Sequence, residues 1–136
     1  MDDWARQRRH AIDIHTAAQR RREQDEAARA GKLVADFALA ASERGIPDVP
    51  LAARAFNGRS RYRTGLRGWY LKPDESIAVG TDGLFYILAV PPSLRARLAG
   101  ATLAPSVPPL TIGEGARDGE SLPLATLLRM RLDDPL

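Results

Sequence analysis

The chain has 136 residues, of which 44% are hydrophobic, 27% charged and 6% aromatic, a composition near the globular average that argues against wholesale disorder and fibrous repetition. It contains no cysteine, which excludes a disulfide framework, thiol catalysis and zinc sites built on cysteine. The formal net charge is only +3, yet residues 54–72 carry six basic residues and no acidic one, so the positive excess lies in a single stretch.

Residues 2–44 predict a long N-terminal helix. They contain no proline and a single glycine, Gly31, and alanine, arginine, glutamine and glutamate dominate. In the second half, apolar residues recur at the spacing of one helical face, at Ala30, Leu33, Val34, Phe37, Ala38 and Ala41. Gly45 and Pro47 then supply a stop signal. We expect this half of the helix to face the core.

The first half of the same helix has only a thin apolar stripe. The stripe consists of Trp4, Ala11, Ile12, His15 and Ala18, and residues 20–26 (RRREQDE) are polar on every side. Pairs such as Asp2–Arg6 and Asp25–Arg29 have the favourable i,i+4 orientation, worth about 0.3–0.5 kcal/mol each. We therefore expect the helix to leave the globular body near residue 26. This divides the chain into a helical arm or oligomerisation segment at 1–31 and a single α+β domain at 32–136.

The segment after the helix stop is predicted to open with a second, short helix. Residues 48–56 fit a helix capped by Asp48, with Pro50 in its first turn. Residues 59–64 then alternate arginine with small residues and Tyr62, which is typical of a loop or an edge strand.

Three strands with short turns are predicted next, as an antiparallel meander. The strands are residues 69–71, 77–79 and 84–90, and the turns are marked by Pro73-Asp74-Glu75 and by residues 80–83 (GTDG). The third strand is apolar on both faces, so we expect it to be central. We expect the sheet to contain these three strands, or four if residues 110–112 join it.

The C-terminal half also predicts helices. Ser93 caps a short helix through Ala99, residues 113–120 form a glycine-rich acidic loop, and Ser121 caps a helix to about Leu132. We expect one sheet face to be covered by helices through Leu33, Phe37, Leu124 and Leu128. The fold class is α+β.

Catalytic and ligand chemistry finds little support. His10 and His15 are five residues apart, which points them about 140° apart on a helix and does not suit a metal pair. Asp74, Glu75 and Asp82 lie in predicted turns, where carboxylates usually serve the turn itself. We expect no enzyme activity, no metal, no cofactor and no small-molecule substrate.

The basic stretch, residues 54–72, offers a nucleic-acid interpretation. Its candidate phosphate-binding residues are Arg54, Arg59, Arg61, Arg63 and Arg67, with Tyr62 or Phe56 available to stack on a base. The competing interpretation is a solvated edge strand whose charges prevent aggregation. Of the 20 basic residues 18 are arginine, which is also what a biased genomic base composition would produce.

The leading hypothesis is a non-enzymatic interaction module, a homo-oligomer or a protein with another protein partner. The contact would be made by the N-terminal helix through Trp4, Ala11, Ile12 and His15, and nucleic-acid binding by the basic stretch is the alternative. The longest apolar run, residues 84–90, is far shorter than the roughly 20 residues of a spanning helix, and no targeting segment is recognisable. We expect a soluble cytoplasmic protein with no membrane partner.

Overall fold

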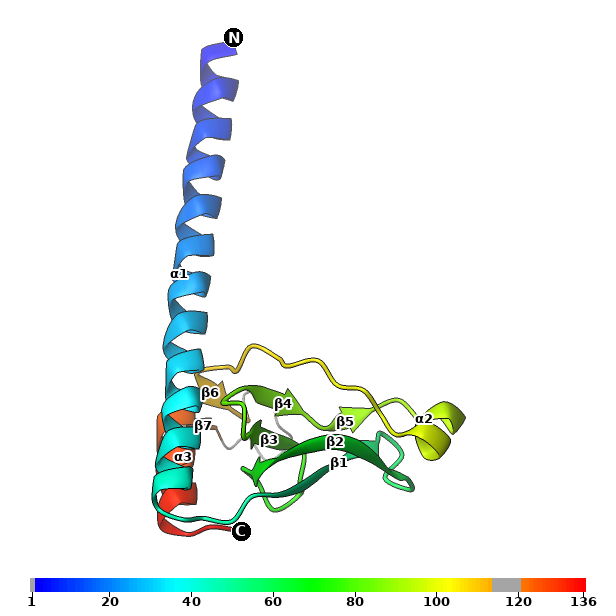
Figure 1. Cartoon of the computed structure of the whole chain (residues 1–136). Coiled ribbons are helices and arrows are strands. Elements are labelled where there is room, and N and C mark those ends of the chain that lie inside the picture. The colour runs from blue at the N-terminus through cyan, green and yellow to red at the C-terminus, as the bar shows by residue number, and fades with distance from the viewer. Residues whose placement is uncertain (1, 114–120) are drawn as a thin grey trace.

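The computed structural model describes residues 2–113 and 121–136, and it shows an α+β fold (Figure 1). A long helix, α1 (Asp2–Glu43), stands at one side of a five-stranded sheet, and the C-terminal helix α3 (Leu124–Asp133) packs beside it. The predicted fold class and both of these helices are confirmed.

The sheet contains β1 (Val49–Ala55), β2 (Arg61–Tyr70), β3 (Ile77–Gly80), β4 (Phe85–Ile87) and β5 (Ala89–Val90). Their order is β4-β3-β2-β1-β5. The first four pair antiparallel in sequence order, as expected for a meander, whereas β5 pairs parallel with β1. The predicted all-antiparallel sheet of three or four strands is therefore one or two strands short, and the prediction misses the parallel pair.

Leu88 closes this sheet on itself. It is the single residue between β4 and β5, which lie at opposite edges of the strand order. Its N–H donates to the carbonyl of Ser76 at 2.9 Å, and its carbonyl accepts from the N–H of Arg54 at 2.8 Å. The chain from 85 to 90 thus belongs to both ends of the strand order, because β4 pairs with β3 and β5 pairs with β1. The expectation of one central strand over 84–90 is wrong in this respect.

Residues 48–56 form strand β1, and the predicted short helix is wrong. Leu51, Ala53 and Ala55 are buried while the residues between them are more exposed, which is the period of a strand. Pairing with β2 overrides the helix preference of alanine. Pro50 lies at a break in the register, where its missing N–H is tolerated. Residues 61–64 lie in β2, where residues 61–63 pair with β1 alone because β3 pairs only with residues 68–70. The edge-strand alternative is therefore confirmed for this stretch, and the loop alternative is wrong.

The C-terminal elements depart from expectation in their pairing and capping. Strand β6 (Thr111–Ile112) forms where a fourth strand was predicted, but it pairs with β7 (Leu122–Pro123) in a separate small sheet. Because residues 122–123 are extended in β7, α3 begins at Leu124 and Ser121 does not cap it. The predicted acidic loop lies outside the described residues from 114 onwards. Helix α2 (Leu94–Ala99) is capped by Ser93, as predicted.

The main core lies between the helices and one face of the sheet. Phe37 of α1 meets Trp69 of β2 edge to face, with ring centroids 6.0 Å apart, and the indole N–H of Trp69 donates to the carbonyl of Ile46. Leu124 and Leu128 are buried in the same cluster, and Leu33 packs against it. The predicted helix-covered face is confirmed.

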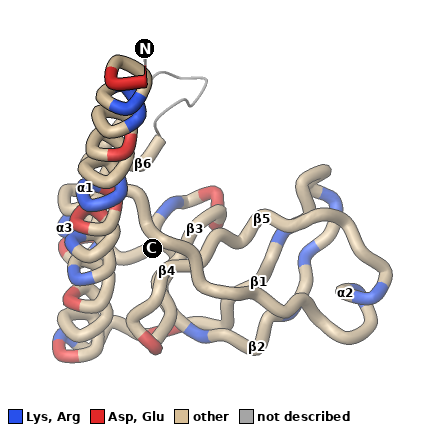
Figure 2. The backbone as a smooth tube through the Cα atoms, turned by 90° about the horizontal axis from the view of Figure 1, so that it is seen from above, with Lys and Arg blue, Asp and Glu red and all other residues tan. Residues whose placement is uncertain are grey.

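A smaller core fills the inner face of the closed sheet. Leu51, Ala78, Tyr86 and Leu88 form one cluster there. A third cluster contains Tyr62 and Ala96, so it holds α2 at the end of the sheet farthest from α1 (Figures 1 and 2).

Candidate functional site

The first half of α1 projects from the body. The helix first meets another segment near Glu23 and Ala27, which border a groove with residues 107–110, and its first buried residue is Ala30. Between residues 2 and 29 every side chain is exposed except the half-buried Ala5 and Ala27. Residues 2–22, here called the projecting segment, therefore extend about 30 Å beyond the domain at 1.5 Å per residue (Figure 1).

The predicted stripe is exposed along the projecting segment. Trp4 keeps 69% of its surface accessible and Ile12 keeps 58%, and Ala11 and His15 are exposed as well. At about 100° per residue, Trp4, Ala11, His15 and Ala18 fall within about 60° of arc, and Ile12 lies about 80° from Trp4 on one side.

Ile14 widens this surface on the other side, and sequence analysis omitted it. It is 56% exposed and lies about 80° from Trp4, opposite to Ile12. The signal was present in the sequence, because Ile14 follows Ala11 by three residues and precedes Ala18 by four.

The face opposite the stripe is charged. Asp2, Arg6, Arg9, Asp13 and Arg20 all fall within about 60° of arc centred about 180° from the stripe. Apolar side chains thus gather on one side of the projecting segment and charged ones on the other, although Arg8 and Arg22 also fall within about 40° of Trp4. We infer that its stripe is available for a contact which this chain does not make within itself.

Side-chain pairs contribute less to the projecting segment than expected. The predicted ion pairs Asp2–Arg6 and Asp25–Arg29 do not form, and across the described part of α1 the only ion pair is Lys32–Asp36, at 2.8 Å. The Arg8 guanidinium instead lies over the Trp4 ring, 5.3 Å from its centroid. The segment is held chiefly by its backbone hydrogen bonds and by continuity with the packed half of α1.

The basic stretch is partly neutralised by acidic residues from outside it. Arg61 and Arg54 both reach Glu75, at 2.8 and 3.8 Å, and Arg67 binds Asp48 at 2.6 Å. Because these two acids flank residues 54–72 in the sequence, counting charge within that window could not reveal them.

Tyr62 does not fit the role of a base-stacking residue. It is buried, and its hydroxyl accepts a hydrogen bond from the N–H of Ser93 at 3.0 Å. The alternation that exposes Arg61 and Arg63 points Tyr62 to the inner side of the closed sheet. Arg59 and Arg63 remain exposed, and neither forms an ion pair with a residue that the structure describes.

The carboxylates of the turns serve those turns. Asp74 accepts hydrogen bonds from the N–H and hydroxyl of Ser76, and Asp82 accepts from the N–H of Leu84. Asp82 also accepts from the hydroxyl of Tyr86 at 2.5 Å. Burial, together with this hydrogen bond and the charge of Asp82, raises the pKa of Tyr86 to about 12.

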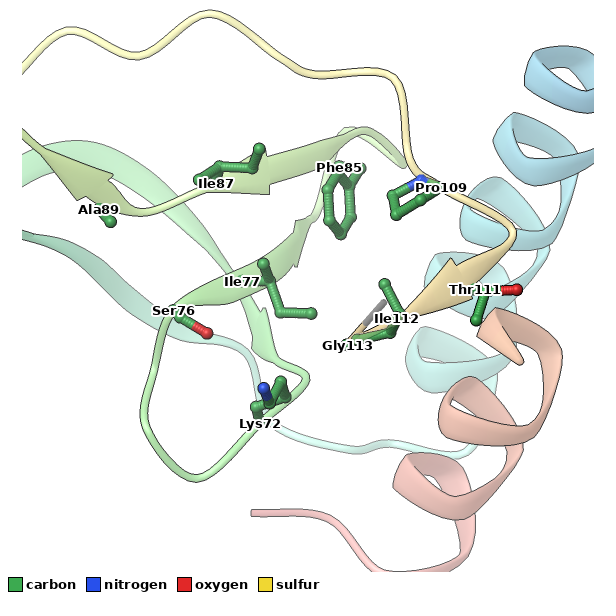
Figure 3. Close-up of a pocket in the computed structure, with 10 residues that line it drawn as sticks. All are labelled: Lys72, Ser76, Ile77, Phe85, Ile87, Ala89, Pro109, Thr111, Ile112 and Gly113. Carbon is green, nitrogen blue, oxygen red and sulfur yellow. The ribbon is translucent and has the colours of Figure 1, made fainter. Parts of the chain in front are cut away.

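An apolar groove of about 520 Å³ lies between β3, β4 and the segment around β6. Figure 3 shows Ile77, Phe85 and Ile112 along it, and Lys72 at its lower end. Lys72 is the only ionisable side chain among the described lining residues.

The two histidines lie on the surface of α1, and the described residues contain no group of three side chains arranged to hold a metal ion. None of the described helices is sufficiently long and apolar to pass through a lipid bilayer. Comparison with protein-family models, curated proteins and solved structures gives no match to this chain.

Proposed function

We propose that this protein is a non-enzymatic interaction module that binds a second copy of itself, or another protein, through the projecting segment of α1. The observation that carries the proposal is the exposed stripe of Trp4, Ala11, Ile12 and His15, on a helix that extends well beyond its own domain. Ile14 borders the stripe on the side opposite to Ile12, about 160° from it around the helix, so one partner surface centred on Trp4 contacts both only at its margins. Apolar side chains grouped on one exposed surface are a usual mark of an interaction site.

Apolar burial is the favourable contribution to association. Burying a large apolar side chain contributes about 1.5–3 kcal/mol, and the exposed Trp4, Ile12 and Ile14 would supply this against an association cost of about 4–15 kcal/mol. An isolated helix of this length is marginal in water because nucleation is costly. Here the packed half of α1 supplies the nucleus, so a partner meets a helix that is already formed and less ordering entropy is lost on binding.

Paired variants test the proposal. In Trp4→Ala/Ile12→Ala the stripe is truncated, and in the control, Arg9→Ala/Arg20→Ala, two residues of the charged face are replaced by the same good helix former. We expect the stripe variant to weaken self-association about tenfold or more, measured as mass by light scattering over a range of concentrations. The control should retain the wild-type mass, and circular dichroism should show equal helicity in both.

The same measurement distinguishes self-association from binding to another protein. Wild-type chain that stays monomeric at every concentration contradicts self-association. Cross-linking from position 4 in cells, compared with position 9 on the charged face, then tests docking of another protein. A stripe variant with unchanged mass, in a wild type that does associate, contradicts the role of the stripe.

Nucleic-acid binding by the basic stretch is the competing proposal. Its support is the exposure of Arg59 and Arg63, and its weakness is the pairing of Arg54, Arg61 and Arg67 with acids. Labelled DNA and RNA are titrated at low and moderate salt with wild type and with Arg59→Ala/Arg61→Ala/Arg63→Ala. Salt-sensitive binding that these substitutions abolish would establish it.

A further inference from the structure

Helix α2 carries the two most exposed large hydrophobic side chains of the described chain. Leu98 keeps 83% of its surface accessible and Leu94 keeps 76%. Four residues apart, they point in nearly the same direction, about 40° from each other. Ala96, which is buried against the domain, lies on the opposite side of the helix. The two leucines, here called the leucine ridge, therefore point directly away from the body.

Arginines flank this ridge on both sides. Arg95 and Arg97 project about 60–100° to either side of the leucine ridge, and both are exposed. Arg63 is adjacent, because its carbonyl accepts from the N–H of Ala101 at 2.7 Å, just beyond α2. Arg59 lies in the turn after β1, whose last residues pair with the strand leading into α2. None of the four forms an ion pair with any residue in the described ranges.

The surrounding chain contributes no negative charge of its own. Residues 49–73 and 84–113 contain eight basic residues and no acidic one. Glu75, Asp48 and Asp74 pair with four of the eight, Arg54, Arg61, Arg67 and Lys72. The other four, on α2, beside it and in the turn after β1, have no acidic partner among the described residues. The complementary surface is anionic and has an apolar layer beneath its charges.

We propose that the α2 end binds the surface of an anionic phospholipid bilayer, with the leucine ridge inserted among the acyl chains and the flanking arginines at the headgroup phosphates. Binding at such an interface combines buried apolar area with attraction to anionic lipid. It requires no spanning helix, so it revises the expectation of no membrane partner without requiring a segment that crosses the bilayer.

A membrane fits the ridge better than a nucleic acid does. Phosphates would satisfy the arginines but leave Leu94 and Leu98 in water, since nucleic acid offers no aliphatic layer. Stacking favours aromatic side chains, and Tyr62 is buried beneath α2. Phe56 is 69% exposed, but an exposed phenylalanine suits the apolar side of a membrane-surface contact equally well. The ridge is also preformed, because Ser93 caps α2 and Ala96 anchors it, so insertion needs no folding step.

Flotation of the full chain with vesicles tests this proposal. The probes are phosphatidylcholine vesicles, and vesicles in which part of that lipid is replaced by phosphatidylserine. We expect binding to the anionic vesicles only, weakened by salt because exposed charges are screened. Leu94→Ala/Leu98→Ala and Arg95→Gln/Arg97→Gln should each reduce the bound fraction about tenfold at limiting lipid. The control, Leu39→Ala/Leu136→Ala, truncates two other exposed leucines, which are 63% and 62% accessible, and should bind as the wild type does.

Three results would overturn it. The first is no binding to anionic vesicles at low salt. The second is binding that the Leu94→Ala/Leu98→Ala variant retains in full, which would reduce the contact to unspecific charge attraction. The third is tight, ridge-dependent binding to a labelled acidic polypeptide or RNA with none to vesicles, which would assign the surface to another class of partner. All four leucines are exposed, so circular dichroism should find every variant folded.

Discussion

The two halves of α1 form one uninterrupted helix and yet have opposite environments. Residues 30–41 place Ala30, Val34, Phe37 and Ala41 in the core, while the projecting segment touches nothing in its own domain. The packed half would form in any context that preserves the sheet. The projecting half is helical because the packed half has already nucleated it, and its apolar stripe has no partner within the chain.

The contrast separates two uses of the same secondary structure. In the packed half, apolar spacing stabilises the fold, and substitutions there should be read out as unfolding. In the projecting half, the same residue types contribute almost nothing to the stability of the monomer, so substitutions should be read out as loss of association. The α2 end shows the second use again, with Leu94 and Leu98 exposed on a helix that Ala96 anchors.

The largest effect is expected from breaking the packed half. Phe37→Ala removes a ring that is buried against Trp69 and should lower the free energy of unfolding by about 3–5 kcal/mol. Trp4→Ala, the matched truncation in the projecting half, should change it by less than about 0.5 kcal/mol at concentrations where the chain is monomeric. Urea denaturation followed by circular dichroism measures both. Equal effects at the two positions would contradict the contrast.

The next effect concerns the inner core and appears at alkaline pH. Because the folded state raises the pKa of Tyr86 from 10.0 to about 12, its neutral hydroxyl stabilises the fold fully below pH 10. That contribution is lost as the pH rises through 12. Tyr86→Phe should cost about 0.5–1.5 kcal/mol at neutral pH, through the lost bond to Asp82, and should flatten the decline in stability between pH 10 and 12. An unchanged alkaline profile would show that another group dominates.

The smallest effect is expected at Gly31, near the boundary between the two halves of α1. Gly31 lies in the middle of α1, and a Cβ at this position would meet no atom within 4 Å. Gly31→Ala should therefore stabilise the helix by about 0.5–1 kcal/mol. Hydrogen exchange should show slower exchange of amides N-terminal to residue 31, with little change in the sheet. Destabilisation would mean that the junction needs the glycine for a contact outside the monomer.

The sequence predicted α1, α2 and α3 because each carries a local signal that packing does not reverse: a helical stripe, a serine cap or a docking face. The prediction was wrong at residues 48–56. The alternate burial of Leu51, Ala53 and Ala55 depends on pairing with β2, and an alanine-rich segment contains no local signal for such a partner strand. The closure of the sheet at Leu88 could not be predicted either. Residues 84–90 have the pattern of one continuous strand, and their division into β4 and β5 depends on pairing with two different strands, β3 and β1.

The candidate surfaces divide in the same way. Exposure of Trp4 and Ile12 follows from a local pattern, and Ile14 could have been added by completing the heptad. Burial of Tyr62 could also have been predicted, from its alternation with Arg61 and Arg63. The neutralisation of Arg61 by Glu75 could not, because the two residues meet only after the chain turns back on itself.

The most direct test of the central claim is the mass of the particle in solution, by light scattering over a range of concentrations, for the full chain and for a truncation beginning at Gly31. The truncation removes the buried Ala30 but keeps the other buried side chains of α1, from Val34 to Ala41, so it must be shown to be folded by circular dichroism. We predict that the full chain increases in mass with concentration while the truncated chain stays monomeric. The same oligomeric state for the two chains at every concentration would contradict the account.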